Sequence, residues 1–255
     1  MHSLTYDEAL ARIGAMVAAG RPHRVVTVNP EFLVIARGDP AFQQVLQSAD
    51  LALADGVGLQ LAAALQGRRF VSRVPGSELI YRLAPLAEAN GWRLFFLGAG
   101  PGVAVQAAAA LRRLHPALQI EVNGADPTPE GTEAALAHIR AARPDILMVA
   151  YGAPTQDLWI ARHGAEVGVP VMMGVGGTLD FVAGVVPRPP KVLHTLGLEW
   201  LYRLWKQPWR WRRQLRLPVF VLLVVAERAS GLLWRRPPTA DRRRVSRNGA
   251  KTQRR

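Results

Sequence analysis

Short runs of mostly apolar residues alternate with helical patterns along most of this chain, and this alternation limits the folds that it can adopt. The runs are apolar throughout, so we expect each strand to be buried on both faces, as in a parallel sheet covered by helices. The predicted strands are Val25–Val28, Leu51–Ala54, Arg93–Leu97, Leu118–Val122, Ile146–Ala150 and Val169–Met173. The predicted helices are Pro40–Ser48, Leu59–Leu65, Ser77–Asn90, Val103–Leu114, Pro129–Ala142 and Gln156–Glu166. The sequence therefore predicts an α/β, Rossmann-like fold, a mostly parallel sheet with helices on both faces, which binds ligands at the carboxyl ends of its strands.

The N-terminal segment predicts a further helix. Thr5 and Glu8 have the spacing of a capping box, so we expect an amphipathic helix to begin near Thr5. No long apolar run is present there, and Asp7 is charged, so this segment does not have the pattern of a secretory signal.

The positive charge of the chain is concentrated near its C-terminal end. The whole chain has a net charge of +13, and residues 200–255 hold 16 Lys and Arg residues against Glu227 and Asp241. A basic segment of this kind suits an anionic membrane or a nucleic acid. We expect an α/β domain at residues 1–197, a basic, Trp-rich helical appendage at 198–236 and a disordered basic tail at 237–255.

An apolar run inside the appendage, Leu217–Ala226, is about half as long as the ~20 residues that a membrane-spanning helix requires. Extending it would place Glu227 and Arg228 in the hydrocarbon, at a cost of a few kcal/mol each. Tryptophans beside arginines instead favour a helix that lies in the headgroup region. The appendage therefore predicts peripheral, monotopic association with an anionic membrane surface.

Two polar side chains, Thr27 and Asn29, follow the first predicted strand. They could line a ligand pocket at the strand's carboxyl end. The segment alone favours a simple turn, because Asn followed by Pro commonly opens one.

Asp55 follows the buried run Leu51–Ala54 directly and is flanked by Gly56 and Gly58. One interpretation is that Asp55 caps the next helix, since Asp is a common N-cap residue. The other is a general base that accepts a proton from a substrate hydroxyl. The segment by itself does not decide between them.

Glycine-rich segments follow three other predicted strands. Gly98–Gly102 could hold a phosphate at the start of a helix, although its glycine spacing differs from that of a dinucleotide-binding turn. Gln156 follows the fifth strand, and Gly174 and Gly176 follow the sixth. Each segment alone also fits a tight turn or a helix cap.

No pattern for a metal or a cofactor is present in the sequence. There is no cysteine, and the six histidines do not form an HxH or HExxH motif. Neither a DxD pair nor a Walker A or GxSxG motif occurs. We expect no metal and no cofactor, so phosphate charge would be met by arginines and helix ends.

These segments occur in a known order, and together they resemble the WecG/TagA/CpsF glycosyltransferases (glycosyltransferase family 26) over residues 5–216. The matching blocks are TVN at 27–29, ADGVG at 54–58, RVPGS at 73–77, FFLGAGPGVA at 95–104, PDILMVAYGAPTQDLWI at 144–160, GVGGTLDFVAG at 174–184 and RPP…GLEWLYRL at 188–204. The resemblance implies an inverting, metal-independent transfer of N-acetylmannosamine, its uronic acid or glucose. The donor would be a UDP-sugar and the acceptor a polyprenyl-diphosphate-linked saccharide at the cytoplasmic membrane face.

The resemblance also implies roles for individual residues. Asp55 matches the general base, with Thr27 and Asn29 beside it. Arg73 matches an arginine near the acceptor or phosphate, and Gln156 matches a pocket glutamine. Arginines of the appendage would complete the site, the candidates being Arg203, Arg210, Arg212, Arg213 and Arg216, of which Arg203 and Arg212 are taken as substrate-binding. Gly98, Gly174 and Gly176 would line the donor pocket.

Three departures from the family pattern leave the donor sugar open. Asp157 replaces a usual glutamate, RPP at 188–190 replaces the commoner RAP, and the extension beyond Leu217 is longer than expected. Two other function classes also remain at this stage. A nucleotide-dependent oxidoreductase could use the same sheet, with Glu121 on the ribose. A nucleic-acid-binding module could use the basic tail, but its basic residues flank an apolar run, which favours lipid. The sequence is compatible with a homo-oligomer.

Overall fold

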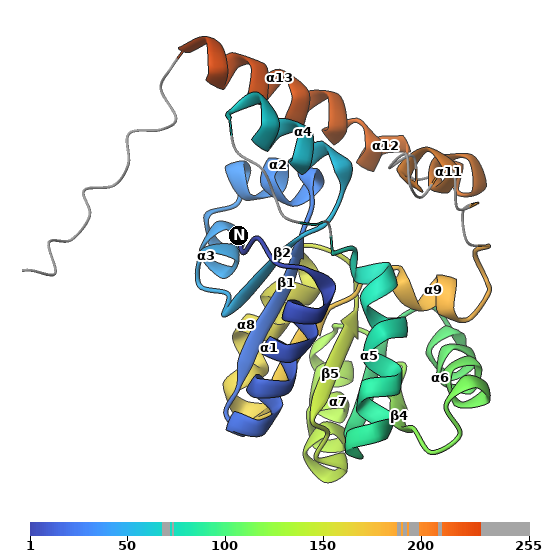
Figure 1. Ribbon diagram of the computed structural model, residues 1–255. Coiled ribbons are helices and arrows are strands. Elements are labelled where there is room, and N and C mark those ends of the chain that lie inside the picture. The colour runs from blue at the N-terminus through green and yellow to red at the C-terminus, as the bar shows by residue number, and fades with distance from the viewer. Residues whose placement is uncertain are drawn as a thin grey trace, which may run out of the picture.

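The computed structural model of the chain describes residues 1–67, 72, 74–187, 190, 193, 199–208 and 211–230 (Figure 1). Its centre is a six-stranded sheet in the order β2-β1-β6-β5-β3-β4, and every neighbouring pair is parallel. The strands are β1 (His23–Val28), β2 (Leu51–Ala54), β3 (Arg93–Gly98), β4 (Gln119–Asn123), β5 (Ile146–Ala150) and β6 (Val171–Gly174). The predicted α/β fold with a parallel sheet is confirmed, and each predicted strand overlaps an observed one.

Helices cover both faces of the sheet (Figure 1). Phe95 and Phe96 are neighbours in β3 and are fully buried in different apolar clusters, because successive side chains of a strand point to opposite faces. Burying one such side chain stabilises the fold by about 1.5–3 kcal/mol. One face carries α1 (Tyr6–Ala19), α5 (Gly76–Asn90), α6 (Val103–Leu114) and α9 (Thr178–Val182), and the other carries α2 (Pro30–Gly38), α3 (Pro40–Gln47), α7 (Pro129–Ala142) and α8 (Thr155–Val167).

The segments that follow β1 and β6 leave the sheet toward opposite faces, a reversal between two neighbouring strands. The helix that follows β1 is α2, which packs on α3, whereas α9, which follows β6, packs on α6 on the other face. In parallel sheets such a reversal opens a crevice beyond the carboxyl ends of the two strands, and ligands bind there. The fold therefore places the expected ligand site beyond β1 and β6.

The start of α2 corrects one sequence-based interpretation. Asn29 and Pro30 favour a turn by themselves, but in the structure Asn29 is the N-cap of α2 and its Oδ1 accepts a hydrogen bond from the Phe32 amide at 3.1 Å. The same pair of residues suits both structures, because proline is also favoured in the first turn of a helix. The capping box of Thr5 and Glu8 is present at the start of α1, as predicted.

The C-terminal appendage lies across the carboxyl end of the sheet (Figure 1). It contains α11 (Glu199–Lys206), α12 (Trp211–Gln214) and α13 (Arg216–Ser230), and α13 packs on α2 and touches α4 (Val57–Leu65). Phe220 and Val224 are buried with Phe32 in one apolar cluster. None of the helices in the described residues has the length and hydropathy that a membrane span requires. The tail predicted to be disordered at 237–255 lies outside the described residues.

Candidate active site

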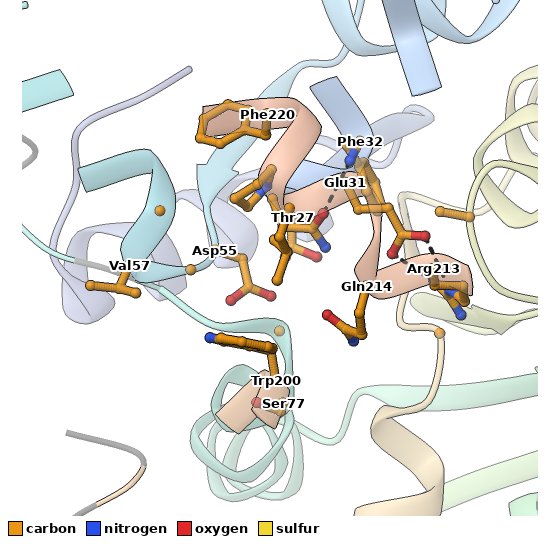
Figure 2. Close-up of a pocket in the computed structure, with 18 of the residues that line it drawn as sticks. Thr27, Glu31, Phe32, Asp55, Val57, Ser77, Trp200, Arg213, Gln214 and Phe220 are labelled. Carbon is orange, nitrogen blue, oxygen red and sulfur yellow. Dashed lines mark hydrogen bonds and ion pairs between the residues drawn. The ribbon is translucent and has the colours of Figure 1, made fainter. Parts of the chain in front are cut away.

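A cavity of about 570 Å³ opens at the carboxyl ends of β1, β2, β5 and β6. The strand-end loops form one side of it, and the appendage forms the other (Figure 2). It is the expected position for a ligand in a parallel α/β sheet. The polar side chains that line it are Thr27, Asn29, Glu31, Asp55, Ser77, Gln156, Thr178, Arg213 and Gln214.

Asp55 is held beside β1 by the backbone of the sheet. Its amide donates a hydrogen bond to the Val28 carbonyl at 2.7 Å, which continues the pairing of β1 with β2 beyond Ala54. The next residue, Gly56, has a φ of 105°, a conformation that glycine adopts without strain. Gly56 is the N-cap of α4, and no side chain caps this helix, so the capping interpretation of Asp55 is wrong. The Asp55 carboxylate instead faces the cavity (Figure 2).

Thr27 lies at the end of β1 and approaches the start of α5. A methyl group placed on Gly76 would lie 3.2 Å from the Thr27 hydroxyl oxygen, so the absence of a side chain at Gly76 lets α5 come this close. Ser77 follows in the first turn of α5 and also lines the cavity. The Thr27 side chain points toward the same space as Asp55 in Figure 2. Sequence reasoning missed Ser77, which is matched only as part of the RVPGS block.

The Gln156 side chain joins two strand-end loops through hydrogen bonds. Its Oε1 accepts hydrogen bonds from the amides of Gly152 at 3.1 Å and Gly176 at 2.9 Å, and the residue is only 3% exposed. A methyl group on Gly174 would lie 2.3 Å from Gln156 Nε2, so only glycine fits there. Three of the predicted site residues, Gln156, Gly174 and Gly176, are thus in mutual contact at the wall of the cavity.

Asp157 is a buried carboxylic acid next to the cavity wall. Desolvation by burial raises its pKa to about 7, while hydrogen bonds with the Gln156 side chain and with its own backbone act in the opposite direction. Its Oδ2 has no hydrogen-bond partner within the part of the chain that the structure describes. At neutral pH this group is therefore divided between its protonated and its ionised form.

Helix N-termini converge on the cavity. The first residues of α4 and α5 and the loop before α9 line it, and no side chain caps any of these three helices. By contrast α1, α3 and α7, which begin elsewhere, are capped by Thr5, Asp39 and Thr128. Amide groups and the helix dipole make such ends favourable for anions. Two helices depart from this pattern, because Asn29 caps α2 within the cavity and no side chain caps α6, which begins outside it.

The appendage supplies a cation to the cavity. Arg213 donates hydrogen bonds to both carboxylate oxygens of Glu31, at 3.0 and 2.9 Å, and Arg216 donates to the same carboxylate at 2.5 Å. Arg213, Gln214 and Trp200 all line the cavity, and the Gln214 amide points into it (Figure 2). Sequence reasoning included Arg213 among the candidate arginines but missed Glu31, Gln214 and Trp200, because nothing local to the sequence shows where the appendage docks.

Two predicted site residues that the structure describes, Gly98 and Arg212, are not among those that line the cavity. Gly98 is outside the residues that line the cavity, and a methyl group on it would lie 2.6 Å from the Tyr151 ring, so packing accounts for this glycine. Arg212 is also outside, with its guanidinium 5.5 Å from the centre of the Trp211 ring. Arg203 belongs to α11, but its side chain is not among those described, and Arg73 lies outside the described residues.

Within the residues that the structure describes, no group of three or more His, Cys, Asp or Glu side chains is arranged to hold a metal ion. Among the described residues that line the cavity, the positive charge comes from Arg213, which is paired with Glu31, and the uncapped helix ends add partial positive charge.

Comparison with known proteins identifies the relatives of this chain. Residues 1–232 match the model of the glycosyl transferase WecG/TagA/CpsF family. A relative from Bacillus spizizenii is 35% identical over 207 residues, which cover 81% of this chain and 80% of the relative. A relative from Bacillus subtilis strain 168 is 32% identical over 216 residues, which cover 85% of this chain and 81% of the relative. Both relatives are named N-acetylglucosaminyldiphosphoundecaprenol N-acetyl-beta-D-mannosaminyltransferase.

Proposed function

Because this chain belongs to the WecG/TagA/CpsF family and is a glycosyltransferase, we propose that it moves a sugar from a UDP-sugar to a polyprenyl-diphosphate-linked saccharide with inversion. The donor sugar is of the N-acetylmannosamine type or is glucose. The observation that carries the proposal is the Asp55 carboxylate, which faces a cavity at the carboxyl edge of the sheet. The names of the two relatives support an acceptor in which N-acetylglucosamine is linked to diphosphoundecaprenol.

In this mechanism Asp55 is the general base. It accepts the proton of the acceptor hydroxyl as the hydroxyl oxygen forms a bond to the anomeric carbon of the donor. The bond from that carbon to the β-phosphate oxygen breaks on the opposite face, and UDP leaves with the electron pair. A positioned base of this kind typically accelerates a reaction by about 10²–10⁴-fold. Thr27, beside Asp55, orients the acceptor.

The leaving UDP gains negative charge on its β-phosphate. Arg213 can stabilise this charge with the N–H groups that do not bind Glu31, since a guanidinium has five N–H donors and hydrogen-bonds well to phosphate oxygens. The uncapped start of α5 adds backbone amides and the positive end of a helix dipole. With these donors we expect the transfer to proceed without a metal ion.

The alternative function, a nucleotide-dependent oxidoreductase, loses its main support. It required the loop Gly98–Gly102 to hold a phosphate, but none of its residues lines the cavity beside Asp55. No second function is therefore proposed.

We further propose that residues 1–197 are the catalytic domain, and that residues 198–236 bind the cytoplasmic face of an anionic membrane. The described part of the appendage supports this with exposed apolar side chains next to basic ones, including Trp205, which is 71% exposed, and Lys206 beside it. A peripheral position would bring the cavity to the lipid-linked acceptor.

The decisive experiment offers a panel of UDP-sugars to the purified full-length chain. Each is paired with a polyprenyl-diphosphate acceptor carrying either N-acetylglucosamine or glucose, and products are identified by mass spectrometry. We expect transfer from one UDP-sugar of the panel, and the same rate in excess EDTA. No product with any donor would overturn the proposed reaction, and loss of product in EDTA would overturn its independence of metal.

A further inference from the structure

Two apolar stripes face each other next to the proposed active site. On α4 the stripe repeats every four residues, from Val57 through Leu61 to Leu65. On α13 it runs along Leu217, Phe220, Val221, Val224 and Val225, the spacing of a single helix face. Both stripes line the same cavity as Asp55. Figure 1 shows α4 and α13 side by side at this end of the molecule.

The stripes line an open groove instead of packing together. Leu61 and Leu65 of α4 are 61% and 48% exposed, and Val221 and Val225 of α13 are 57% and 55% exposed. α13 is held by α2, where Phe220 is buried. Adjacent helices that leave facing apolar residues exposed usually have a further apolar partner.

Both ends of the groove are defined. At the far end the Arg228 guanidinium donates a hydrogen bond to the Leu65 carbonyl, so a cation from α13 meets the C-terminal end of α4. At the near end α4 begins at Gly56 and Val57, immediately after Asp55. The groove thus begins at the proposed base and runs along the nine residues of α4, about 13 Å at the rise of an α-helix.

We propose that this groove binds the first part of the polyprenyl chain of the acceptor. This inference extends the proposed function, since it takes the lipid-linked acceptor from it. The acceptor consists of a sugar, then a diphosphate, then a hydrocarbon chain. The protein presents matching groups in the same order. The Asp55 carboxylate would face the sugar, the uncapped start of α4 the diphosphate, and the apolar stripes the hydrocarbon chain. A sugar hydroxyl held at Asp55 directs the diphosphate to the start of α4 and the chain into the groove.

Acceptors with a long and a short hydrocarbon chain distinguish lipid binding in the groove from docking of α13 on a membrane. The groove variant is Val221→Ser with Val225→Ser. The matched control is Val219→Ser with Leu222→Ser, two residues of the same helix that are 43% and 69% exposed but do not line the cavity. The acceptors are N-acetylglucosaminyl-diphosphoundecaprenol in detergent micelles and an analogue whose diphosphate carries only a short, water-soluble alkyl chain. Thermal unfolding of each variant verifies its fold.

For the groove variant we expect kcat/KM to fall about tenfold more with the long acceptor than with the short one, because buried apolar contacts are lost only with the long chain. The control variant should keep the preference of the unaltered protein for the long acceptor. A groove variant that also keeps this preference would overturn the proposal. An equal loss in both variants would overturn it too, and would assign this helix to membrane docking.

A binding experiment tests the groove without sugar transfer. A polyprenyl diphosphate carrying a photoreactive group near its diphosphate end is irradiated with the full-length protein. We expect labelling of peptides from residues 57–65 and 217–225, reduced in the groove variant. Labelling elsewhere would overturn the groove while leaving the proposed reaction standing. Labelling in the groove by a protein that transfers no sugar would instead retain the groove and overturn the reaction.

Discussion

Arg213 of α12 donates two hydrogen bonds to the carboxylate of Glu31 in α2, from Nε to Oε1 at 3.0 Å and from Nη2 to Oε2 at 2.9 Å (Figure 2). Arg216 binds the same carboxylate, so one side chain of α2 holds two arginines of the appendage. Both Glu31 and Arg213 line the cavity. The contact therefore fixes the appendage at the place where the proposed leaving group would gain its charge.

Replacing Glu31 by Gln should loosen the appendage. The change removes the negative charge that two arginines share, and partly exposed ion pairs contribute about 1 kcal/mol or less each. We expect a small decrease in the midpoint of thermal unfolding and faster trypsin cleavage near Arg213. Glu130→Gln is the matched control, because Glu130 is an exposed first-turn glutamate of α7. Equal cleavage rates in the two variants would contradict the role of Glu31 in docking.

Replacing Asp55 by Asn tests the proposed base. Asparagine has nearly the same shape but cannot accept the proton, so we expect kcat to fall by about 10²–10⁴-fold. UDP binding, measured by calorimetry, should change little, because the proposed donors to the diphosphate of UDP are Arg213 and the start of α5. A variant with wild-type turnover would exclude Asp55 as the base. Lost UDP binding would show that the carboxylate supports the fold of the pocket.

Much of the fold could be predicted because its signals are local. The apolar runs of β2 and β5 and the apolar periodicity of α6 and α7 gave bounds that agree with the structure. Asn29 with Pro30 was ambiguous, because the same dipeptide opens a turn or a helix, and the helical periodicity beyond it was overlooked.

The candidate site was only partly predictable. Asp55 and Thr27 follow strands, so the topology of a parallel sheet brings them to one edge. Glu31 and Arg213 meet across 182 positions of sequence, and no local pattern encodes that contact. Gly98 and Gly174 look alike as strand-end glycines, yet one packs on Tyr151 and the other on Gln156 at the cavity wall. Only the three-dimensional packing separates these two roles.

Replacing Gly174 by Ala should displace Gln156. The added methyl group would lie 2.3 Å from Gln156 Nε2, so the amide that joins Gly152 to Gly176 must shift. We expect a loss of about 1–3 kcal/mol in the free energy of unfolding, the usual cost of overpacking. Gly38→Ala is the control, because nothing lies within 4 Å of a methyl group there. Urea unfolding measures both, and equal stability of the two variants would contradict the close contact.

Replacing Asp157 by Asn should stabilise the protein more at alkaline pH than at acidic pH. Burial raises the pKa of Asp157 to about 7 in the folded state, well above its ordinary value of 3.8. The folded protein therefore holds this proton more tightly than the unfolded chain does, and stability falls as the pH rises from about 4 through 7. Above pH 7 the folded protein contains a buried carboxylate whose Oδ2 lacks a partner among the described residues.

Asparagine at position 157 is neutral at every pH and has the same shape, so it avoids that desolvation penalty. We expect the gain in stability over the unaltered protein to be about 1–3 kcal/mol larger at pH 8.5 than at pH 5. Urea unfolding at both values measures the difference. Asp7→Asn, at an exposed position in the first turn of α1, controls for the loss of one negative charge. If the Asp157 variant were no more stable at pH 8.5 than at pH 5, relative to the unaltered protein, the carboxyl group could not be titrating near neutrality in the folded state.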